Sequence, residues 1–452
     1  MKKVSITSLG CSKNLIDSEQ MTEVLRQRGY EFMENEADAD IMIVNTCVFI
    51  EDAQTESINC ILELAACKKE DKSKKLIVCG CLAQRYKEQV IREIPEVDAV
   101  IGVNEFDKIA DILDALPAGG DSVHCSEKPL LCEAGRVRTT PEYTAYLKIA
   151  EGCDNRCTYC VIPSIRGAYR SRTIENIVSE AREMASEGVK ELIVIAQDTT
   201  RYGIDIYGEY RLPELLRQLC AVEGITWVRV HYCYPELISD ELIEVFRTEP
   251  KLCNYLDIPV QHASDRVLKR MGRRTNRAQI TDMIKRFRER VPDVVLRTSI
   301  IVGFPGETEE DFDELLDFID EVRFDRLGVF KYSREEDTPA YSLPDQIDEE
   351  EKTKRLEAVL VAQAEIDDEN NSRRCGSVQT VLVEGRDELA ESYYGRTYAD
   401  SVDIDGKVFF TSDRKLSAGD FVDVELCEAM DMDFFGKAVP MPERSVLNEF
   451  TE

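Results

Sequence analysis

Three cysteines lie within eight residues in the segment EGCDNRCTYC, directly after a predicted strand. Cys153, Cys157 and Cys160 have the spacing C-x3-C-x2-C. Three thiolates on one short loop can hold three corners of an iron–sulfur cube, and the fourth iron then stays open to a small molecule. Zinc fits less well, because its sites usually pair C-x2-C with a second such pair or with histidine, and none lies nearby. Coincidental burial of three cysteines is the other alternative.

A second set of cysteines is spread through the first part of the chain. Cys11 lies in SLGCSKN, Cys47 in VNTCVF and Cys81 in CGCLAQR, and each follows a predicted strand. Ligands gather at the carboxyl ends of the strands in an open α/β sheet, so these three could converge there. Cys79 could point to the same face as Cys81 if both lie on a strand. Since buried cysteines are also common in cores, the spacing alone leaves a second site open.

The elements that would position these cysteines alternate between strands and helices over residues 1–115. Near-continuous apolar runs such as ADIMIVNTCVF are typical of buried parallel strands. Strands are predicted at 4–10, 39–49, 74–81 and 98–103, and helices at 18–30 and 52–67. This βαβ order predicts an open parallel α/β sheet.

Residues 116–140 contain PAGG and no clear period, and they are predicted to be a linker. Regular βα units resume in residues 141–372. Six strands are predicted at 146–152, 190–198, 227–232, 255–261, 296–305 and 326–333, with amphipathic helices such as 173–189 between them. Six such units favour a partial or complete (β/α) barrel. A long exposed helix at 349–371 is predicted to lead out of it.

Residues 373–445 change character, with short strands, glycine-containing turns and no helical period. The strands are predicted at 378–385, 395–406, 408–411 and 420–430. This pattern predicts a small β-barrel of about five strands.

The chain has 452 residues, 88 acidic and 57 basic side chains, and a formal net charge of −31. This charge argues against a general nucleic-acid binder, which needs clustered lysine and arginine, and against an anionic membrane surface. A basic partner is easier to accommodate. The longest apolar block, 41–50, is too short for a membrane helix, and the N-terminus has no signal-peptide pattern. A cytoplasmic location with reduced thiols is therefore expected, where clustered cysteines indicate metal or catalysis.

The cysteine loop and the βα series after it resemble the radical S-adenosylmethionine (SAM) superfamily. The order SLGCSKN, NTC, GCLAQRY and EGCDNRCTYCVIPSIRG, followed by a small β domain, resembles the methylthiotransferase family of these enzymes over essentially the whole chain. The resemblance implies a radical SAM partial (β/α)6 barrel and a C-terminal TRAM domain, which is an OB-like barrel. It also implies two 4Fe-4S clusters, with SAM bound at the first. The implied ligands are Cys153, Cys157 and Cys160 for the first cluster, and Cys11, Cys47 and Cys81 for the second.

The same resemblance indicates SAM or substrate contacts in the cysteine loop and at the mouth of the predicted barrel. The candidates are Tyr159, Gln197, Asp198, Gln261, Gly303 and Gly306. The two glycines follow a predicted strand, where a backbone could approach a ligand closely, although a plain turn before a helix explains them as well. His262 is one of only three histidines, and a structural role is the favoured interpretation.

The reaction implied by the resemblance replaces a hydrogen on carbon with a methylthio group. One SAM would methylate sulfur on the second cluster, and a second SAM would supply the radical. An external electron donor is implied, and the sulfur donor is unknown. A non-catalytic iron–sulfur carrier is the alternative from a different class of protein.

The substrate is a choice between two branches of the resembled family. Some members modify adenosine in transfer RNA, and one branch modifies the β-carbon of an aspartate in small-subunit ribosomal protein twelve. SLGCSKN and the PSIRG end of the cysteine loop resemble the second branch, since the tRNA enzymes tend to have Gln-Met-Asn after the first cysteine. Residues 373–452 hold nine basic and 17 acidic side chains, so direct binding to tRNA is not expected. An acidic domain would instead attract a basic ribosomal protein, although a generally acidic proteome would also explain it.

Overall fold

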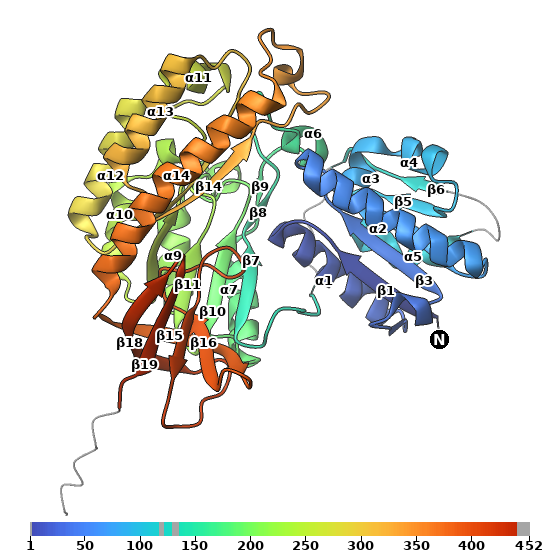
Figure 1. Cartoon of the computed structure of the whole chain (residues 1–452). Helices are drawn as coiled ribbons and strands as arrows, with labels where there is room; N and C mark the ends of the chain where they lie inside the picture. Colours follow the sequence, from blue (N-terminus) through green and yellow to red (C-terminus); the bar gives the residue numbers. More distant parts are fainter. Residues whose placement is uncertain (1, 117–121, 129–134, 441–452) are drawn as a thin grey trace, which may run out of the picture.

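A computed structural model describes residues 2–116, 122–128 and 135–440, which form three bodies (Figure 1). The N-terminal body is a parallel sheet with strand order β2-β1-β3-β4-β5-β6, which confirms the predicted open α/β sheet. Its strands are β1 (Lys3–Ser8), β2 (Glu31–Phe32), β3 (Ile41–Thr46), β4 (Lys75–Gly80), β5 (Ala99–Ile101) and β6 (Ser122–His124). Its helices are α1 (Ser12–Gln27), η1 (Glu36–Asp38), α2 (Glu51–Glu70), α3 (Cys81–Tyr86), α4 (Glu88–Glu93), η2 (Phe106–Lys108) and α5 (Ile109–Ala115).

The segment predicted as a linker, 116–140, differs in part from that prediction. Residues 122–124 form β6, which pairs in parallel with β5, and the N–H of Val137 donates to the carbonyl of Glu19 in α1 at 3.2 Å. A strand of three residues is too short to show a period of two, so its sequence carries no strand signal. Residues 117–121 and 129–134 lie outside the described residues.

The central body is a row of six parallel strands, in the order β14-β13-β12-β11-β10-β7, with helices on its outer side. It is a partial (β/α)6 barrel, as predicted. Its strands are β7 (Thr144–Lys148), β10 (Glu191–Ile195), β11 (Trp227–Val230), β12 (Leu252–Asp257), β13 (Val295–Val302) and β14 (Arg326–Lys331), with a small ribbon of β8 (Ala150–Glu151) and β9 (Arg170–Ser171). Its helices are α6 (Ile162–Arg166), α7 (Ile174–Ser186), α8 (Ile204–Tyr207), α9 (Leu212–Cys220), η3 (Pro235–Leu237), α10 (Asp240–Thr248), α11 (Asp265–Arg270), α12 (Arg277–Arg290), α13 (Glu309–Val322), η4 (Pro339–Ser342) and α14 (Glu349–Arg374).

Local sequence explains where the barrel helices begin. Asn276 caps α12 by accepting from the N–H of Gln279, whose side chain accepts from the N–H of Asn276. Thr308 and Asp311 form the same reciprocal pair at α13. Such capping boxes satisfy main-chain donors that a helix start would otherwise leave unpaired. The apolar faces of these helices then pack onto the strands in one buried core.

The C-terminal body is a closed barrel with strand order β15-β16-β17-β19-β18, as predicted. Its strands are β15 (Val378–Asp387), β16 (Ser392–Arg396), β17 (Val408–Thr411), β18 (Phe421–Met430) and β19 (Asp433–Ala438). The strand predicted at 395–406 is wrong beyond residue 396. There the side chain of Asp400 accepts from the hydroxyl of Thr397 at 2.6 Å, and such local side-chain bonds compete with strand pairing.

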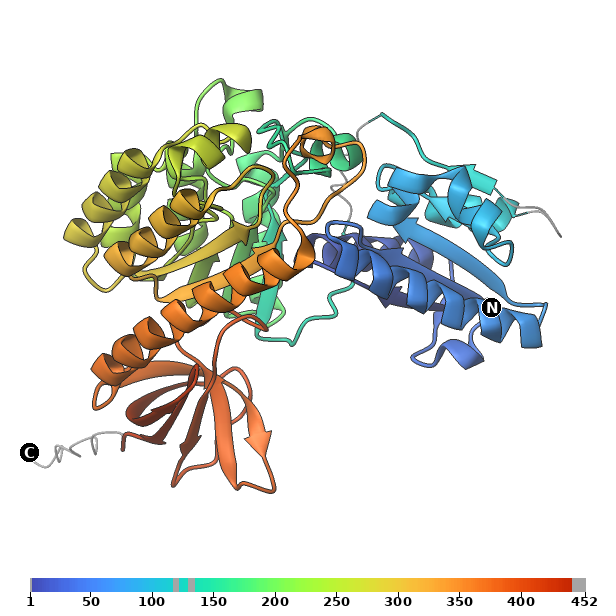
Figure 2. The same cartoon turned by 45° about the horizontal axis from the view of Figure 1, so that its top comes forward.

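The loop 397–405 and the start of the small barrel pack onto the amino ends of the central strands, below α14 in Figure 2. Arg396 donates to the fully buried carboxylate of Glu191 at 2.7 Å, and Arg229 donates to it at 3.2 Å. Burial would raise the pKa of Glu191, but these two guanidinium groups lower it to about 2. A buried ion triad therefore joins the two bodies.

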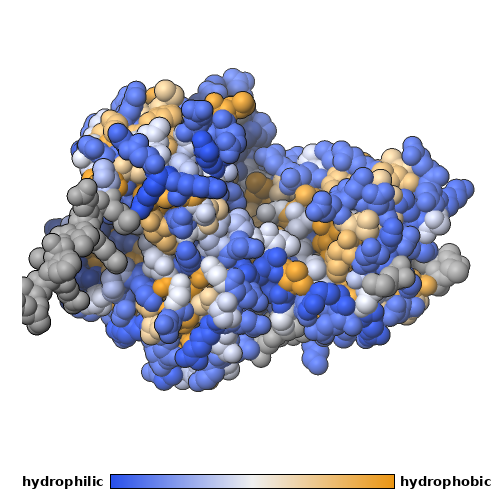
Figure 3. Space-filling model, turned by 90° about the horizontal axis from the view of Figure 1, so that it is seen from below, coloured by the Kyte–Doolittle hydropathy of each residue, from blue (hydrophilic) through white to orange (hydrophobic). Residues whose placement is uncertain are grey.

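The face of the molecule shown in Figure 3 is mainly hydrophilic and is hollowed between the N-terminal body and the rest of the molecule. Within the described residues, none of the helices combines the length and apolar character needed to cross a bilayer.

Candidate metal centres and the interface between them

The first cysteine set occupies the loop between β8 and α6. Cys153 and Cys157 are buried and Cys160 is half-buried. Gly152 has φ +83°, and a Cβ there would lie 2.2 Å from the carbonyl oxygen of Ala168. Only glycine tolerates both this approach and this φ, so the turn that starts the loop depends on it.

Thr158 anchors the middle of this loop to other segments. Its N–H donates to the carbonyl of Met271 at 2.9 Å, and its hydroxyl donates to the carbonyl of Arg270 at 2.8 Å. Its own carbonyl accepts from the N–H of Ala340 at 2.9 Å. The position of the cysteine loop therefore rests on bonds to two other parts of the barrel.

A buried arginine approaches the loop from the barrel side. Nη1 of Arg273 lies 3.9 Å from Sγ of Cys157, and Nη2 donates to the carbonyl of Pro259 at 2.8 Å. The guanidinium also lies over the ring of Tyr234, 4.4 Å from its centroid. Tyr159, the aromatic residue singled out in the sequence, packs onto a small buried cluster beside the loop. The loop thus combines three thiols with one fixed positive charge.

The second cysteine set does converge at the carboxyl ends of three strands. Cys11 follows β1 and precedes α1, Cys47 follows β3, and Cys81 begins α3 directly after β4. Cys11 is exposed, whereas the other two are buried. Gly10 has φ +84°, and a Cβ there would lie 2.8 Å from Sγ of Cys47. The absence of a side chain at Gly10 therefore allows the end of β1 to approach the end of β3.

Burial raises the pKa of several thiols in the two sets. Burial raises the pKa of Cys153 to about 11 and the pKa of Cys81 to about 12. The nearby Cys11 and Cys47 thiols add to the rise in the pKa of Cys81. Because the thiolate is the ligand form, a metal cluster binding here would displace these protons.

Cys79 does not join the second set. It lies within β4, opposite Asn45 and Ile101 on the neighbouring strands, and its side chain is fully buried in the apolar core. Burial and the nearby Cys125 raise the pKa of Cys79. The condition under which Cys79 and Cys81 could share a face, that both lie on a strand, is not met, because β4 ends at Gly80 and Cys81 begins α3.

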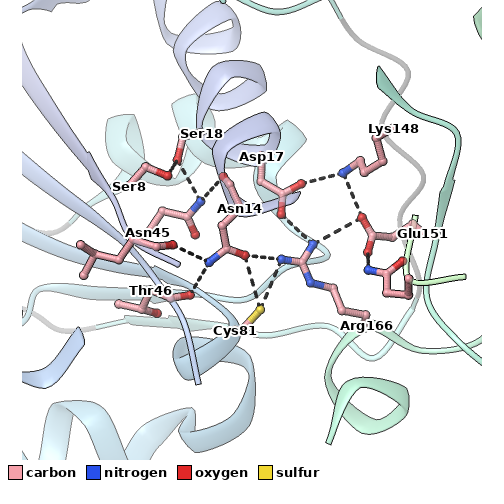
Figure 4. Close-up of polar contacts among 12 residues, drawn as sticks. Ser8, Asn14, Asp17, Ser18, Asn45, Thr46, Cys81, Lys148, Glu151 and Arg166 are labelled. Atoms are coloured by element: carbon pink, nitrogen blue, oxygen red, sulfur yellow. Dashed lines mark hydrogen bonds and ion pairs between the residues drawn. The ribbon is translucent and has the colours of Figure 1, made fainter. Parts of the chain in front are cut away.

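A buried arginine connects the second cysteine set to the first cysteine loop (Figure 4). Arg166, at the end of α6 and six residues after Cys160, donates through Nη2 to Sγ of Cys81 at 3.3 Å and to Oδ1 of Asn14 at 2.6 Å. Asn14 in turn donates to the carbonyl of Thr46 at 2.8 Å. One side chain thus ties the N-terminal body to the segment that carries the first thiols.

Two carboxylates and two cations complete this interface. Nη1 of Arg166 donates to Asp17 at 2.6 Å and to Glu151 at 3.3 Å. Nζ of Lys148 donates to the same two carboxylates, at 2.7 and 2.9 Å. Burial opposes ionisation, but Lys148 and Arg166 hold the pKa of Glu151 well below its ordinary value. The four charges balance, so the network is neutral as a whole.

Sequence reasoning missed most of this network. Asp17 and Lys148 are 131 positions apart, and ordinary lysine, aspartate and glutamate residues carry no local signal of such a contact. Arg166 had one available signal, its place in the PSIRG segment directly after the cysteine loop.

The predicted SAM contacts Gln197, Asp198 and Gln261 all follow central strands, and the structure shows what each one touches. Nε2 of Gln197 donates to Glu151 at 2.6 Å, so Gln197 borders the network. Asp198 is fully buried and accepts from Asn155 of the cysteine loop at 2.8 Å. Gln261 has φ +73°, and its main chain pairs with β13.

The two glycines and His262 have structural surroundings. A Cβ at Gly303 would lie 2.3 Å from Cγ of Lys352, and one at Gly306 would lie 2.7 Å from the guanidinium of Arg270. Packing within the chain therefore accounts for both glycines. His262 is fully buried and accepts from the N–H of Ser264, and burial lowers its pKa to about 3, which favours the structural interpretation.

The donor sets fit iron–sulfur cubes better than single ions. Across residues 2–116, 122–128 and 135–440, no group of His, Cys, Asp or Glu side chains is arranged to hold one metal ion. A cube spreads its thiolates over different irons, and soft thiolate ligands select such clusters. A triad of thiols with no fourth protein ligand among the described residues would leave one iron of each cube open to a small molecule.

Comparisons with known proteins define the class of this chain. Family models for the radical SAM superfamily match residues 147–319, for the TRAM domain residues 375–439, and for uncharacterized protein family UPF0004 residues 3–102. A radical SAM methyltransferase structure, TsrM from Kitasatospora setae, has TM-score 0.56 and 14% identity over 75% of this chain and 77% of that one. The cobalamin-dependent SAM radical enzyme OxsB has TM-score 0.54 over 80% of this chain and 56% of that one, at 16% identity. The protein is a radical SAM enzyme.

Full-length relatives narrow this class. A ribosomal protein uS12 methylthiotransferase RimO from Lachnoclostridium phytofermentans is 51% identical over 96% of this chain and 100% of its own length. RimO of Clostridioides difficile is 48% identical over 96% of this chain and 98% of its own length. The chain belongs to the RimO family.

Proposed function

We propose that this chain is a methylthiotransferase that places a methylthio group on the β-carbon of an aspartate in ribosomal protein uS12. The observation that carries this proposal is the contact of Arg166 with Cys81, because it brings two thiol triads to the two sides of one buried interface. The full-length relatives named for this activity support it. The full-length relatives named above do not favour methylthiolation of tRNA adenosine, the alternative from the sequence.

In this proposal each triad holds one 4Fe-4S cluster. Cys153, Cys157 and Cys160 hold the cluster that binds SAM, and when bound it supplies the electron that makes radical chemistry on carbon accessible. Arg273 places a positive charge beside Cys157, and the loop anchors keep the thiols in position. Cys11, Cys47 and Cys81 hold the second cluster as the sulfur carrier, and Gly10 and Arg166 position it.

The candidates for SAM contacts are the residues around the cysteine loop and the barrel mouth. Asp198 and Gln197 suit this role best, because one bonds to the cysteine loop and the other to Glu151. The remaining candidates are Tyr159, Gln261, Gly303 and Gly306.

The substrate side of the proposal rests on charge. Residues 373–452 carry nine basic and 17 acidic side chains, which oppose a phosphate backbone and attract a basic protein. A ribosomal substrate, reduced thiols and an external electron donor are consistent with a cytoplasmic enzyme.

The test is the mass of uS12 after incubation with anaerobically reconstituted enzyme, SAM, sulfide and a reductant. We expect one methylthio group on an aspartate-containing peptide, with Cys153→Ala as the control that gives none. Modification of tRNA adenosine in place of uS12 would overturn the proposed substrate. An absence of 5′-deoxyadenosine under these conditions would point to the non-catalytic carrier.

A further inference from the structure

Lys13 is a buried cation without a buried anion to match it. It lies in the first turn of α1, is 8% exposed, and its Nζ is 3.5 Å from the centroid of the Tyr232 ring. Among the described residues, its ammonium forms no ion pair with a carboxylate. Tyr232 is a polar and aromatic neighbour of this ammonium but carries no negative charge as a neutral phenol. An ammonium that is held out of water without a counter-charge costs free energy, so such a residue needs a reason to be there.

The neighbouring carboxylates already form ion pairs with other cations. Asp17 and Glu151 each bond to both Lys148 and Arg166, and these four charges balance. Neither of these two carboxylates therefore forms an ion pair with Lys13 among the residues that the structure describes. A ring face next to it attracts a cation only weakly compared with a carboxylate.

Lys13 lies close to both the second cysteine set and the carboxyl ends of the barrel strands, where a substrate would bind. It is two residues after Cys11 of the second cysteine set. Its neighbour Tyr232 lies just beyond the carboxyl end of β11 and packs with Ile193 and Ile195 of β10. Ligands of βα barrels bind at the carboxyl ends of the strands. Lys13 thus stands between the second cysteine set and the mouth of the barrel.

We propose that Lys13 binds the side-chain carboxylate of the substrate aspartate and so selects an acidic residue; this inference rests on the proposed function. The carboxylate carbon of aspartate is bonded directly to the β-carbon. Holding the carboxylate therefore fixes the carbon to be modified, to within one bond, beside the second cysteine set. SAM also carries a carboxylate, and the test must separate the two.

The experiment measures binding of reconstituted enzyme to uS12 in the absence of reductant, so that no turnover occurs. Two forms of uS12 are compared, one with the target aspartate and one with Asp→Asn at that position. A charge-assisted hydrogen bond predicts that wild-type enzyme binds the aspartate form about tenfold to 100-fold more tightly. Lys13→Met should bring this ratio close to one, and Lys13→Arg should keep part of it.

Lys2→Met is the matched control, since it removes the same charge from an exposed site in the same body. It should leave the ratio unchanged. Iron content and SAM affinity are measured for every variant, and Lys13→Gln replaces Lys13→Met if the latter fails to fold.

The inference is overturned if Lys13→Met or Lys13→Gln still binds the aspartate form of uS12 more tightly than the asparagine form by the wild-type ratio. Loss of SAM affinity with an unchanged ratio also overturns it, and assigns Lys13 to the carboxylate of SAM. A wild-type enzyme that binds uS12 equally well in both forms removes the basis for Lys13 as a selector but leaves the proposed function intact. A wild-type enzyme that neither binds nor modifies uS12 overturns the proposed function itself.

Discussion

Each of the two cysteine triads provides three thiols, but the chain brings the three together in a different way in each triad. Cys153, Cys157 and Cys160 come from one loop of eight residues, so their spacing in the sequence nearly defines their arrangement. Cys11, Cys47 and Cys81 come from three strand ends spread over 71 residues and meet only because the sheet is parallel. The arrangement of the first triad is set by one short segment, whereas the arrangement of the second is set by the fold of the whole N-terminal body.

Both triads begin after a glycine with positive φ and both have a buried guanidinium beside one sulfur. The supports of the two arginines differ. Arg273 is held by a carbonyl and an aromatic ring within its own body, whereas Arg166 reaches across an interface and pairs with Asp17 and Glu151. The second triad is therefore expected to depend on contact between bodies, and the first is not.

The largest expected effect separates the roles of the triads. Cys153→Ala should abolish formation of 5′-deoxyadenosine, whereas Cys81→Ala should retain it and abolish only methylthio transfer. Each variant should lose about four of about eight irons per chain. Iron analysis and product chromatography after anaerobic reconstitution measure both effects. The same product pattern in both variants would contradict the division of labour.

The next effect tests the interface. Arg166→Gln leaves Lys148 as the remaining cation of the network for both Asp17 and Glu151. The loss of one partner from a buried ion network costs about 3–5 kcal/mol of unfolding free energy. Urea unfolding followed by circular dichroism measures this loss. Arg28→Gln, which breaks two exposed ion pairs, with Asp111 and Asp114, should cost less than about 1 kcal/mol. If iron is lost equally from both triads in Arg166→Gln, the proposed difference in dependence fails.

A smaller effect is expected at the glycine before the second triad. Gly10→Ala should destabilise the protein by about 1–3 kcal/mol, through strain at positive φ and overlap with Cys47, and should lower the iron of that triad. Gly29→Ala is the control, since Gly29 has φ +82° with open space around it. Gly29→Ala should lower the free energy of unfolding through the same backbone strain and should keep the full iron content. Iron loss in the control would mean that strain alone disturbs the triad.

The smallest effect concerns the cysteine that lies outside the second triad. Cys79→Ala should cost about 1 kcal/mol for a small cavity in the core and should leave the iron content unchanged. Thermal unfolding and iron analysis provide the two measurements. Loss of about four irons would assign Cys79 to the cluster in place of Cys81.

The features that could be predicted from the sequence are those set within one segment of the chain, and the features that could not are those set by contacts between distant residues. The order of strands and helices in the two α/β bodies and the small closed barrel have local patterns, and the predicted fold class was confirmed. The loop triad also has a local pattern, and its role as a set of cluster ligands stays a prediction. The convergence of Cys11, Cys47 and Cys81 needed the rule for parallel sheets. The ion network, the strand β6 and the polar loop 397–405 depend on contacts between distant residues, for which hydrophobic periods carry no signal.

The ion triad of Glu191, Arg229 and Arg396 has a consequence for synthesis of the chain. Arg396 lies near the C-terminal end, so it leaves the ribosome after the central strands are complete. Until then Glu191 has only Arg229 as a cationic partner among the described residues of the triad, and the amino end of the barrel lacks the apolar cover that Phe421 gives to Trp227. The amino end of the barrel is therefore complete only after the C-terminal body, which the structure describes over residues 375–440, has folded. Maturation of the enzyme must wait for that folding.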